Sequence, residues 1–219
     1  MEKPEYDYLV DGAAIYEKSF AIIREEADLS RFPEDVANVA VRMIHAAADT
    51  GLPELIEFTP GVVQACRDAL WTGAPIFCDS TMTATGIIRS RLPKDNEVVC
   101  YLKDPRLPEL AKELGTTKTA AAVDLWAERL EGAVVTIGNA PTALFRLLEI
   151  VRDTGVKPAG VIGIPVGFVG AAESKQALVE NPYGLEYLVV SGRRGGSAMA
   201  VSAVNAIAST DERTNESKR

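Results

Sequence analysis

The sequence has 219 residues, 47% of them hydrophobic, and a formal net charge of −8 at pH 7. This length and composition suit one α/β domain with a substantial core. The acidic balance argues against nucleic acid as a main partner, because binding a phosphate backbone needs a basic face. A small anion held by a local basic patch remains compatible with it.

The apolar stretches are short and interrupted by Gly, Pro or charged residues, which predicts no transmembrane helix and no membrane partner. The first twelve residues lack the basic region and apolar core of a signal peptide. The cysteines lack the spacing of a metal site and fit buried thiols of a cytoplasmic protein. We expect one domain over residues 1–208 and a polar, disordered tail over 209–219. The cysteines are Cys66, Cys78 and Cys100.

The N-terminal third is predicted to be helical. In residues 11–28 apolar side chains recur at helical spacing opposite charged ones, and Asp11 is placed to cap that helix. A second helix follows Pro33, where residues 34–49 carry an apolar stripe. A third helix is expected over residues 60–70.

From residue 74 onward, short apolar runs alternate with helical patterns. This alternation predicts βαβ units, and therefore an α/β fold with a mostly parallel sheet of about five strands. The runs are apolar throughout, as strands covered on both faces should be. The expected strands lie in 74–78, 97–102, 132–138, 159–167 and 186–192. The expected helices lie in 82–92, 108–114, 118–130, 140–155, 171–181 and 196–209.

Ligands of open parallel sheets bind beyond the carboxyl ends of the strands. In the last such loop, Arg193 and Arg194 precede Gly195, Gly196 and Ser197, which open a helix. Two cations at a helix N-terminus form a good cradle for a carboxylate or phosphate, although a solvated surface turn explains the same residues. Lys175 stands in the first turn of a helix, where a cation is electrostatically out of place, and is a candidate ligand contact. The nucleotide-binding patterns GxGxxG and GxxxxGK[ST] are missing.

The second helix carries the single histidine of the chain, His45. Asn38, Arg42, His45 and Asp49 follow one another at spacings that form a polar stripe. His45 is the one candidate for histidine acid–base chemistry, and the alternative is a histidine on the surface or satisfied by a partner. A metal site is not expected, because there is no second histidine. Ser19, on the first helix, either bonds its own backbone or faces a ligand.

Several long blocks of the sequence resemble the precorrin-8X methylmutase family, in the family's order and over about residues 5 to 207. The blocks are AAIYEKSFAIIREEADLSRFPEDVANVAVRMIHAAAD, APIFCDSTMTATGI, GNAPTALFRLLE, GIPVGFVGAAESK and RRGGSAMA. The resemblance implies an isomerase of cobalamin biosynthesis. Such an enzyme moves a methyl group from C-11 to C-12 of precorrin-8X to give hydrogenobyrinate, without a cofactor or metal.

The resemblance further implies a three-layer α/β/α fold with helices on both faces of the sheet, and the N-terminal helices are expected to pack near the active site. It also implies a homodimer with active sites near the subunit interface. It gives His45 the role of proton donor and acceptor, and it makes Ser19 and Arg42 substrate contacts. Thr85 lies in a block that lines the family's ring pocket. Because the substrate is a flat ring with many carboxylates, Arg42, Arg193, Arg194 and the loop amides are expected to supply anion sites, and Lys175 is expected to contact the substrate.

The expected mechanism needs little covalent chemistry from the protein. His45, as imidazolium, would donate a proton or strong hydrogen bond to a ring nitrogen near C-11, while Arg42 clamps a carboxylate and lowers the His45 pKa by repulsion. Three alternatives remain: the cobalt-precorrin-8 methylmutase of the anaerobic pathway, a non-catalytic corrinoid carrier, and a nucleotide or phosphosugar enzyme that uses the RRGGS loop. The last rests on fold analogy alone.

Overall fold

The structure is a computed structural model that describes residues 6–181 and 183–209. The strands of this part of the chain form one six-stranded sheet with the order β1-β6-β5-β4-β2-β3. All neighbouring strands are parallel except β1, which runs antiparallel to β6 at one edge. The strands are β1 (Ile56–Phe58), β2 (Ile76–Cys78), β3 (Val98–Val99), β4 (Val134–Ile137), β5 (Gly160–Gly163) and β6 (Tyr187–Val190).

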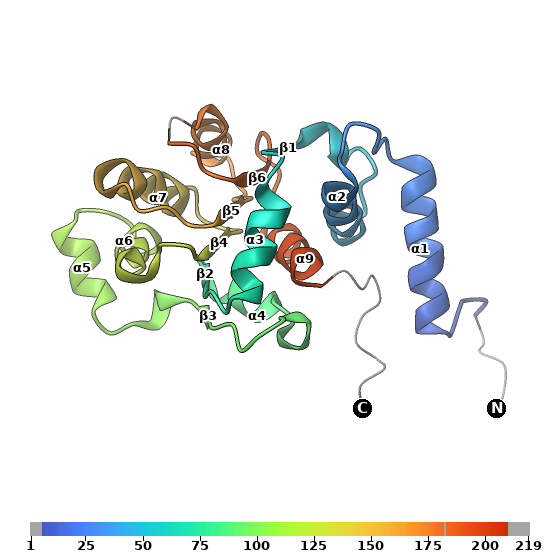
Figure 1. Cartoon of the computed structure of the whole chain (residues 1–219), viewed down its shortest axis with the longest axis horizontal. Coiled ribbons are helices and arrows are strands. Elements are labelled where there is room, and N and C mark those ends of the chain that lie inside the picture. The colour runs from blue at the N-terminus through green and yellow to red at the C-terminus, as the bar shows by residue number, and fades with distance from the viewer. Residues whose placement is uncertain (1–5, 182, 210–219) are drawn as a thin grey trace.

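Helices cover both faces of the sheet, as the alternating pattern predicted (Figure 1). One face packs against α3, α4 and α9, with α2 packed against α9, and the other against α6, α7 and α8, with α5 beside α6. Helix α1 lies outside these layers, against α2. The helices are α1 (Gly12–Glu26), α2 (Glu34–Ala47), α3 (Val62–Trp71), α4 (Thr81–Gly86), α5 (Leu107–Glu113), α6 (Lys118–Asp124), α7 (Pro141–Thr154), α8 (Ala171–Glu180) and α9 (Ser197–Ala208).

Strand β1 was missed in the sequence, because three residues between a 3-10 turn and a Thr-Pro pair are too few to show a period. It exists because β6 offers it a free edge, where Ile56 pairs with Val190 and the Ser191 amide then donates to the Leu55 carbonyl at 2.7 Å. The expected strand 97–102 is correspondingly shorter, with only Val98 and Val99 in the sheet.

Two expected helices also end earlier than their patterns suggested. Helix α4 stops at Gly86, because the Asn205 side chain of α9 forms hydrogen bonds with the backbone at and after that residue. This side chain accepts from the Ile88 amide at 2.9 Å and donates to the Gly86 carbonyl at 3.1 Å. Helix α6 stops at Asp124 and passes into a 3-10 turn. The predicted tail, from residue 210 onward, lies outside the described residues.

The N-terminal helices begin where their capping residues predicted. The Asp11 carboxylate accepts from the Ala14 amide at 3.1 Å and opens α1. Helix α2 begins after Pro33 with Glu34 and Asp35 in its first turn, where acidic side chains favour the helix dipole. It ends at Ala47 and is capped by Ala48, a non-glycine residue in the left-handed conformation with φ of 51°.

Candidate active site

Helices α1 and α2 form a hairpin that encloses the only histidine. Arg24 of α1 donates to the Asn38 side chain of α2 at 3.2 Å, which ties the two helices together. From α1, the rings of Tyr16 and Phe20 approach the His45 ring, with centroid distances of 5.4 Å and 5.2 Å. Asn38 and His45 of the predicted polar stripe therefore face α1.

The setting of His45 favours its neutral form. Burial lowers the pKa of the imidazole, and the positive charge of Arg42 lowers it further. The Arg42 guanidinium lies 5.3 Å from the centroid of the Phe20 ring. The predicted repulsion between Arg42 and His45 is thus present, but desolvation among the α1 aromatic rings is the larger cause.

Ser19 lies at the edge of the α1 face that meets α2. It is half-buried, and it follows Tyr16 by three residues and precedes Phe20. Tyr16 and Phe20 were not predicted as site residues from the sequence, although their spacing of four residues places both rings on one helix face. That spacing, together with a histidine on the next helix, was the signal available.

The carboxyl end of α2 is joined to the loop after β6. Asp49 accepts from the Gly51 amide at 3.0 Å with one oxygen and forms an ion pair with Arg194 with the other. The Arg194 carbonyl in turn accepts a 2.6 Å hydrogen bond from the ammonium group of Lys175 on α8. The structure therefore joins two expected site residues, Arg194 and Lys175, to the segment that follows α2, the helix of His45.

Arg193 points to a different neighbour. Its guanidinium lies 5.4 Å from the centroid of the Phe168 ring, and its carbonyl accepts from the Gly167 amide at 3.3 Å. Phe168 is 84% exposed and Val169 is 89% exposed, so the loop after β5 presents apolar side chains at the carboxyl edge of the sheet. Neither Phe168 nor Val169 was among the site residues expected from the sequence.

The glycines of the RRGGS segment serve the protein's own backbone. A Cβ on Gly195 would lie 2.5 Å from the carbonyl oxygens of both Ile164 and Pro165. The Gly196 amide donates to Ile164 at 2.9 Å. Ser197, the first residue of α9, is buried and accepts from the Thr83 hydroxyl at 3.0 Å.

A buried carboxylate organises the neighbouring strand ends. Asp79, after β2, accepts from the backbone amides of Gly138, Asn139 and Ala140 at 3.0, 2.8 and 2.7 Å, and so occupies the N-terminus of α7. Burial raises the pKa of Asp79, and the amide hydrogen bonds oppose that rise. Thr85 lies exposed on α4, on the same face of the sheet as α2.

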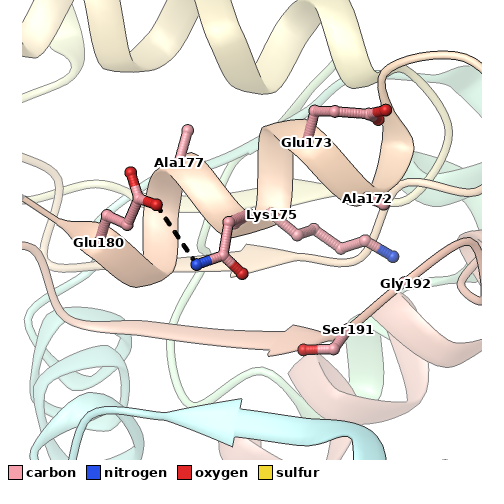
Figure 2. A pocket seen from close by; sticks show the side chains of 8 residues that line it. Ala172, Glu173, Lys175, Ala177, Glu180, Ser191 and Gly192 are labelled. Atoms are coloured by element: carbon pink, nitrogen blue, oxygen red, sulfur yellow. Dashed lines mark hydrogen bonds between the residues drawn. The ribbon is translucent and has the colours of Figure 1, made fainter.

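A cavity of about 470 Å³ lies between α8 and the end of β6 (Figure 2). Lys175 stretches along it towards Gly192, and Ser191 forms the opposite wall. Glu173 and Glu180 also line it, so its rim is acidic. This cavity is on the α7–α8 face, whereas His45 belongs to the α1–α2 face.

Other candidate groups of the described chain have structural explanations. Cys66 and Cys78 are buried free thiols, as expected, whereas Cys100 is only partly buried. Burial raises the pKa of Cys66 to about 12, so its thiol stays protonated and unreactive. Within residues 6–181 and 183–209, no three His, Cys, Asp or Glu side chains gather in a way that could hold a metal ion. In the same residues, no helix is long and apolar enough to cross a membrane.

The comparison with known proteins decides the family. The family model described as precorrin-8X methylmutase matches residues 14–210. The chain belongs to the precorrin-8X methylmutase family. It is an isomerase of cobalamin biosynthesis, as the resemblance implied.

Named relatives match the chain over almost its whole length. A precorrin-8X methylmutase of Sinorhizobium is 60% identical over 94% of this chain and 98% of its own. The precorrin-8X methylmutase of Pseudomonas aeruginosa is 53% identical over 94% of this chain and 99% of its own. A solved precorrin-8X methylmutase from Thermus thermophilus superposes with a TM-score of 0.81 at 42% identity, covering 90% of this chain and 95% of that one. This likeness confirms the predicted α/β class.

Relatives named for a cobalt-containing substrate are more distant. The cobalt-precorrin-8 methylmutase of Salmonella typhimurium is 38% identical over 91% of this chain and 96% of its own. Both kinds of methylmutase therefore share one fold and one family.

Proposed function

We propose that this methylmutase acts on metal-free precorrin-8X and moves the methyl group from C-11 to C-12 to give hydrogenobyrinate. The observation that carries this choice is the gap in identity: 60% and 53% to relatives named for precorrin-8X, against 38% to the Salmonella typhimurium relative named for cobalt-precorrin-8. A corrin ring without cobalt is therefore the substrate for which this chain is expected to be selective.

His45 is the proposed proton donor and acceptor, with Ser19 and Arg42 as substrate contacts. In the free protein the lowered pKa keeps the imidazole largely neutral near pH 7. A substrate carboxylate bound to Arg42 would offset that cation, because an opposite charge favours the imidazolium. Substrate binding thus favours the protonated form of His45. The imidazolium then donates a hydrogen bond to a ring nitrogen near C-11, which weakens the bond between C-11 and the migrating methyl group.

The loops at the strand ends supply the proposed anion sites. The exposed side chain of Arg193 is suited to a peripheral carboxylate, and Phe168 beneath it offers apolar contact to the ring. Arg194 and Lys175 are engaged with Asp49 and with the backbone, so we assign them to the rim of the substrate site. Thr85 is proposed to line the ring pocket from α4.

We also propose that the protein is a cytoplasmic homodimer and that residues 1–208 form one domain. Support for the dimer comes from apolar side chains exposed at the N-terminus and on α1, outside the helical layers (Figure 1). They are Tyr6, Tyr8, Leu9, Val10, Ile15 and Ile22.

One spectral experiment tests the proposed reaction. Purified protein is mixed anaerobically with precorrin-8X, or in a parallel sample with cobalt-precorrin-8, and the visible spectrum is followed. Conversion of precorrin-8X to the hydrogenobyrinate spectrum, faster than any change in the cobalt sample, is expected. A bound but unchanged chromophore would instead identify a carrier, and faster conversion of the cobalt compound would reverse the proposed selectivity.

A further inference from the structure

Lys175 is a charged side chain in an unusual place. It is 1% exposed, and Figure 2 shows it extended from α8 towards Gly192 at the end of β6. Its ammonium group donates to the Arg194 carbonyl at 2.6 Å, and burial lowers the pKa of the amine to about 8. Burying an ammonium group costs stability, so a hydrophobic core alone gives no reason for a lysine here.

The residue that Lys175 holds is fixed on a rigid loop. The backbone next to Arg194 lies against β5: Gly196 donates to the Ile164 carbonyl, and Gly195 has no space for a side chain. With its carbonyl held by Lys175, Arg194 directs its guanidinium away from α8 to the carboxylate of Asp49.

Asp49 connects this loop to the helix of the proposed catalytic histidine. It follows Ala48, which closes α2 in the left-handed conformation without the glycine that this conformation favours. The Asp49 amide reaches back to the Ile44 carbonyl at 3.4 Å, and its carboxylate binds both the Gly51 amide and Arg194. His45 occupies the last turn that these contacts close.

We propose that Lys175, Arg194 and Asp49 form a positioning chain that crosses the carboxyl edge of the sheet and fixes the last turn of α2, and with it His45. The three residues act through contacts in series, from α8 through the loop after β6 to the end of α2. None of them needs to touch the reacting atoms. The proposal rests on the proposed role of His45 and adds the residues that hold it in place.

The test measures the last turn of α2 directly, by amide hydrogen exchange of His45, Ala46 and Ala47. We expect Lys175→Met and Asp49→Asn each to speed this exchange by roughly tenfold, because both release the same local structure. Lys175 is on the opposite face of the sheet from α2, so a purely local role would change exchange only in α8 and in residues 191–196. Asp153→Asn, which removes the carboxylate of the exposed Arg152–Asp153 pair, is the matched control and should change nothing in α2.

Turnover supplies the second readout. Each of Lys175→Met and Asp49→Asn is expected to lower kcat roughly fivefold or more, because a small misplacement of a catalytic group slows the chemical step. Asp49 is not a proposed substrate contact, so KM should change little in Asp49→Asn. The double variant should be no worse than the poorer single variant, since both break one chain. Additive losses, or unchanged exchange in α2 with Lys175→Met, would overturn the proposal.

Further variants cover the case in which Lys175→Met does not fold and separate the positioning chain from the role of His45. If Lys175→Met fails to fold, Asp49→Asn together with Arg194→Gln tests the same chain from its exposed end, where the Asp49 side chain is 34% accessible. The His45→Ala variant separates the two hypotheses. If that variant keeps full turnover, the proposed role of His45 fails whatever the exchange shows. If it loses turnover while exchange in α2 is unaffected by the other variants, only the positioning chain fails.

Discussion

The imidazole of His45 meets the ring of Phe20 nearly edge to face, at an interplanar angle of 65° and a centroid distance of 5.2 Å. An aromatic ring in this position removes water from one side of the imidazole, which disfavours the charged form. The same Phe20 ring lies under the Arg42 guanidinium. One side chain of α1 therefore sets the surroundings of both polar groups that the proposed mechanism uses.

Replacing His45 with Ala should leave the fold intact and lower turnover at least tenfold, because a positioned general acid contributes roughly 10²–10⁴-fold. The measurement is the rate of the spectral change with precorrin-8X, alongside the thermal midpoint of each protein. Full turnover in the variant would remove His45 from the chemistry.

Arg42→Gln should raise the pKa of His45 without restoring its ordinary value, because burial is the larger cause of the shift and stays in place. With only one histidine in the chain, a tag-free sample gives one imidazole signal, whose chemical shift against pH reports this pKa. Arg152→Gln, which removes an exposed cation on α7 on the other face of the sheet, is the control and should not move it. A pKa that is unchanged or lower in Arg42→Gln would contradict the assigned repulsion.

The lowered pKa also makes stability depend on pH. Because the folded-state pKa of His45 lies below the unfolded value of about 6.5, the unfolded chain binds the proton more strongly. The stability due to the neutral imidazole is therefore complete above pH 6.5 and is lost as the pH falls through the folded-state value. Urea denaturation of the wild type and of His45→Gln should show a difference in stability that changes below pH 6.5 and is constant above it. If the stability difference between the two proteins changed only above pH 6.5, the pKa of His45 would be raised in the folded state, contrary to the prediction.

Gly195→Ala should destabilise the protein by about 1–3 kcal/mol, because its methyl group would overlap two backbone carbonyl oxygens. Gly192→Ala is the comparison: its φ of 74° is strained for alanine, but its Cβ has open space, so a cost of about 1 kcal/mol is expected. Denaturation midpoints of the two variants check this order. Equal midpoints would mean that the loop yields to the added methyl group.

Asp79→Asn should destabilise the protein by about 2–4 kcal/mol. Both carboxylate oxygens of Asp79 accept backbone N–H groups, from Gly138, Asn139 and Ala140, whereas an asparagine side chain has only one accepting oxygen. The denaturation midpoint is the measurement. Asp153→Asn, at an exposed ion pair, should leave that midpoint unchanged. A midpoint in Asp79→Asn as high as in this control would show that the carboxylate contributes nothing to stability.

The sequence predicted the long elements well, because apolar spacing and end signals agree in them. Helix α1 begins after Asp11 and α2 after Pro33, as expected. The short strand β1 was missed because pairing with β6, far away in the sequence, defines it. Gly86 ends α4 because of Asn205 on another helix, which no local pattern announces. Local sequence patterns therefore did not predict β1 or the end of α4, because residues distant in the sequence determine both.

By itself, the sequence determined that a single histidine stands one helical turn from Arg42, since both belong to one continuous amphipathic helix. It also carried the family resemblance, because that is a property of residue order. Only the tertiary structure decided that Phe20 and Tyr16 desolvate His45, and that Asp49, Arg194 and Lys175 join three distant segments. The physical reason is range: helix periodicity acts over a few residues, whereas burial and ion pairing depend on which segments the folded sheet brings to the same edge.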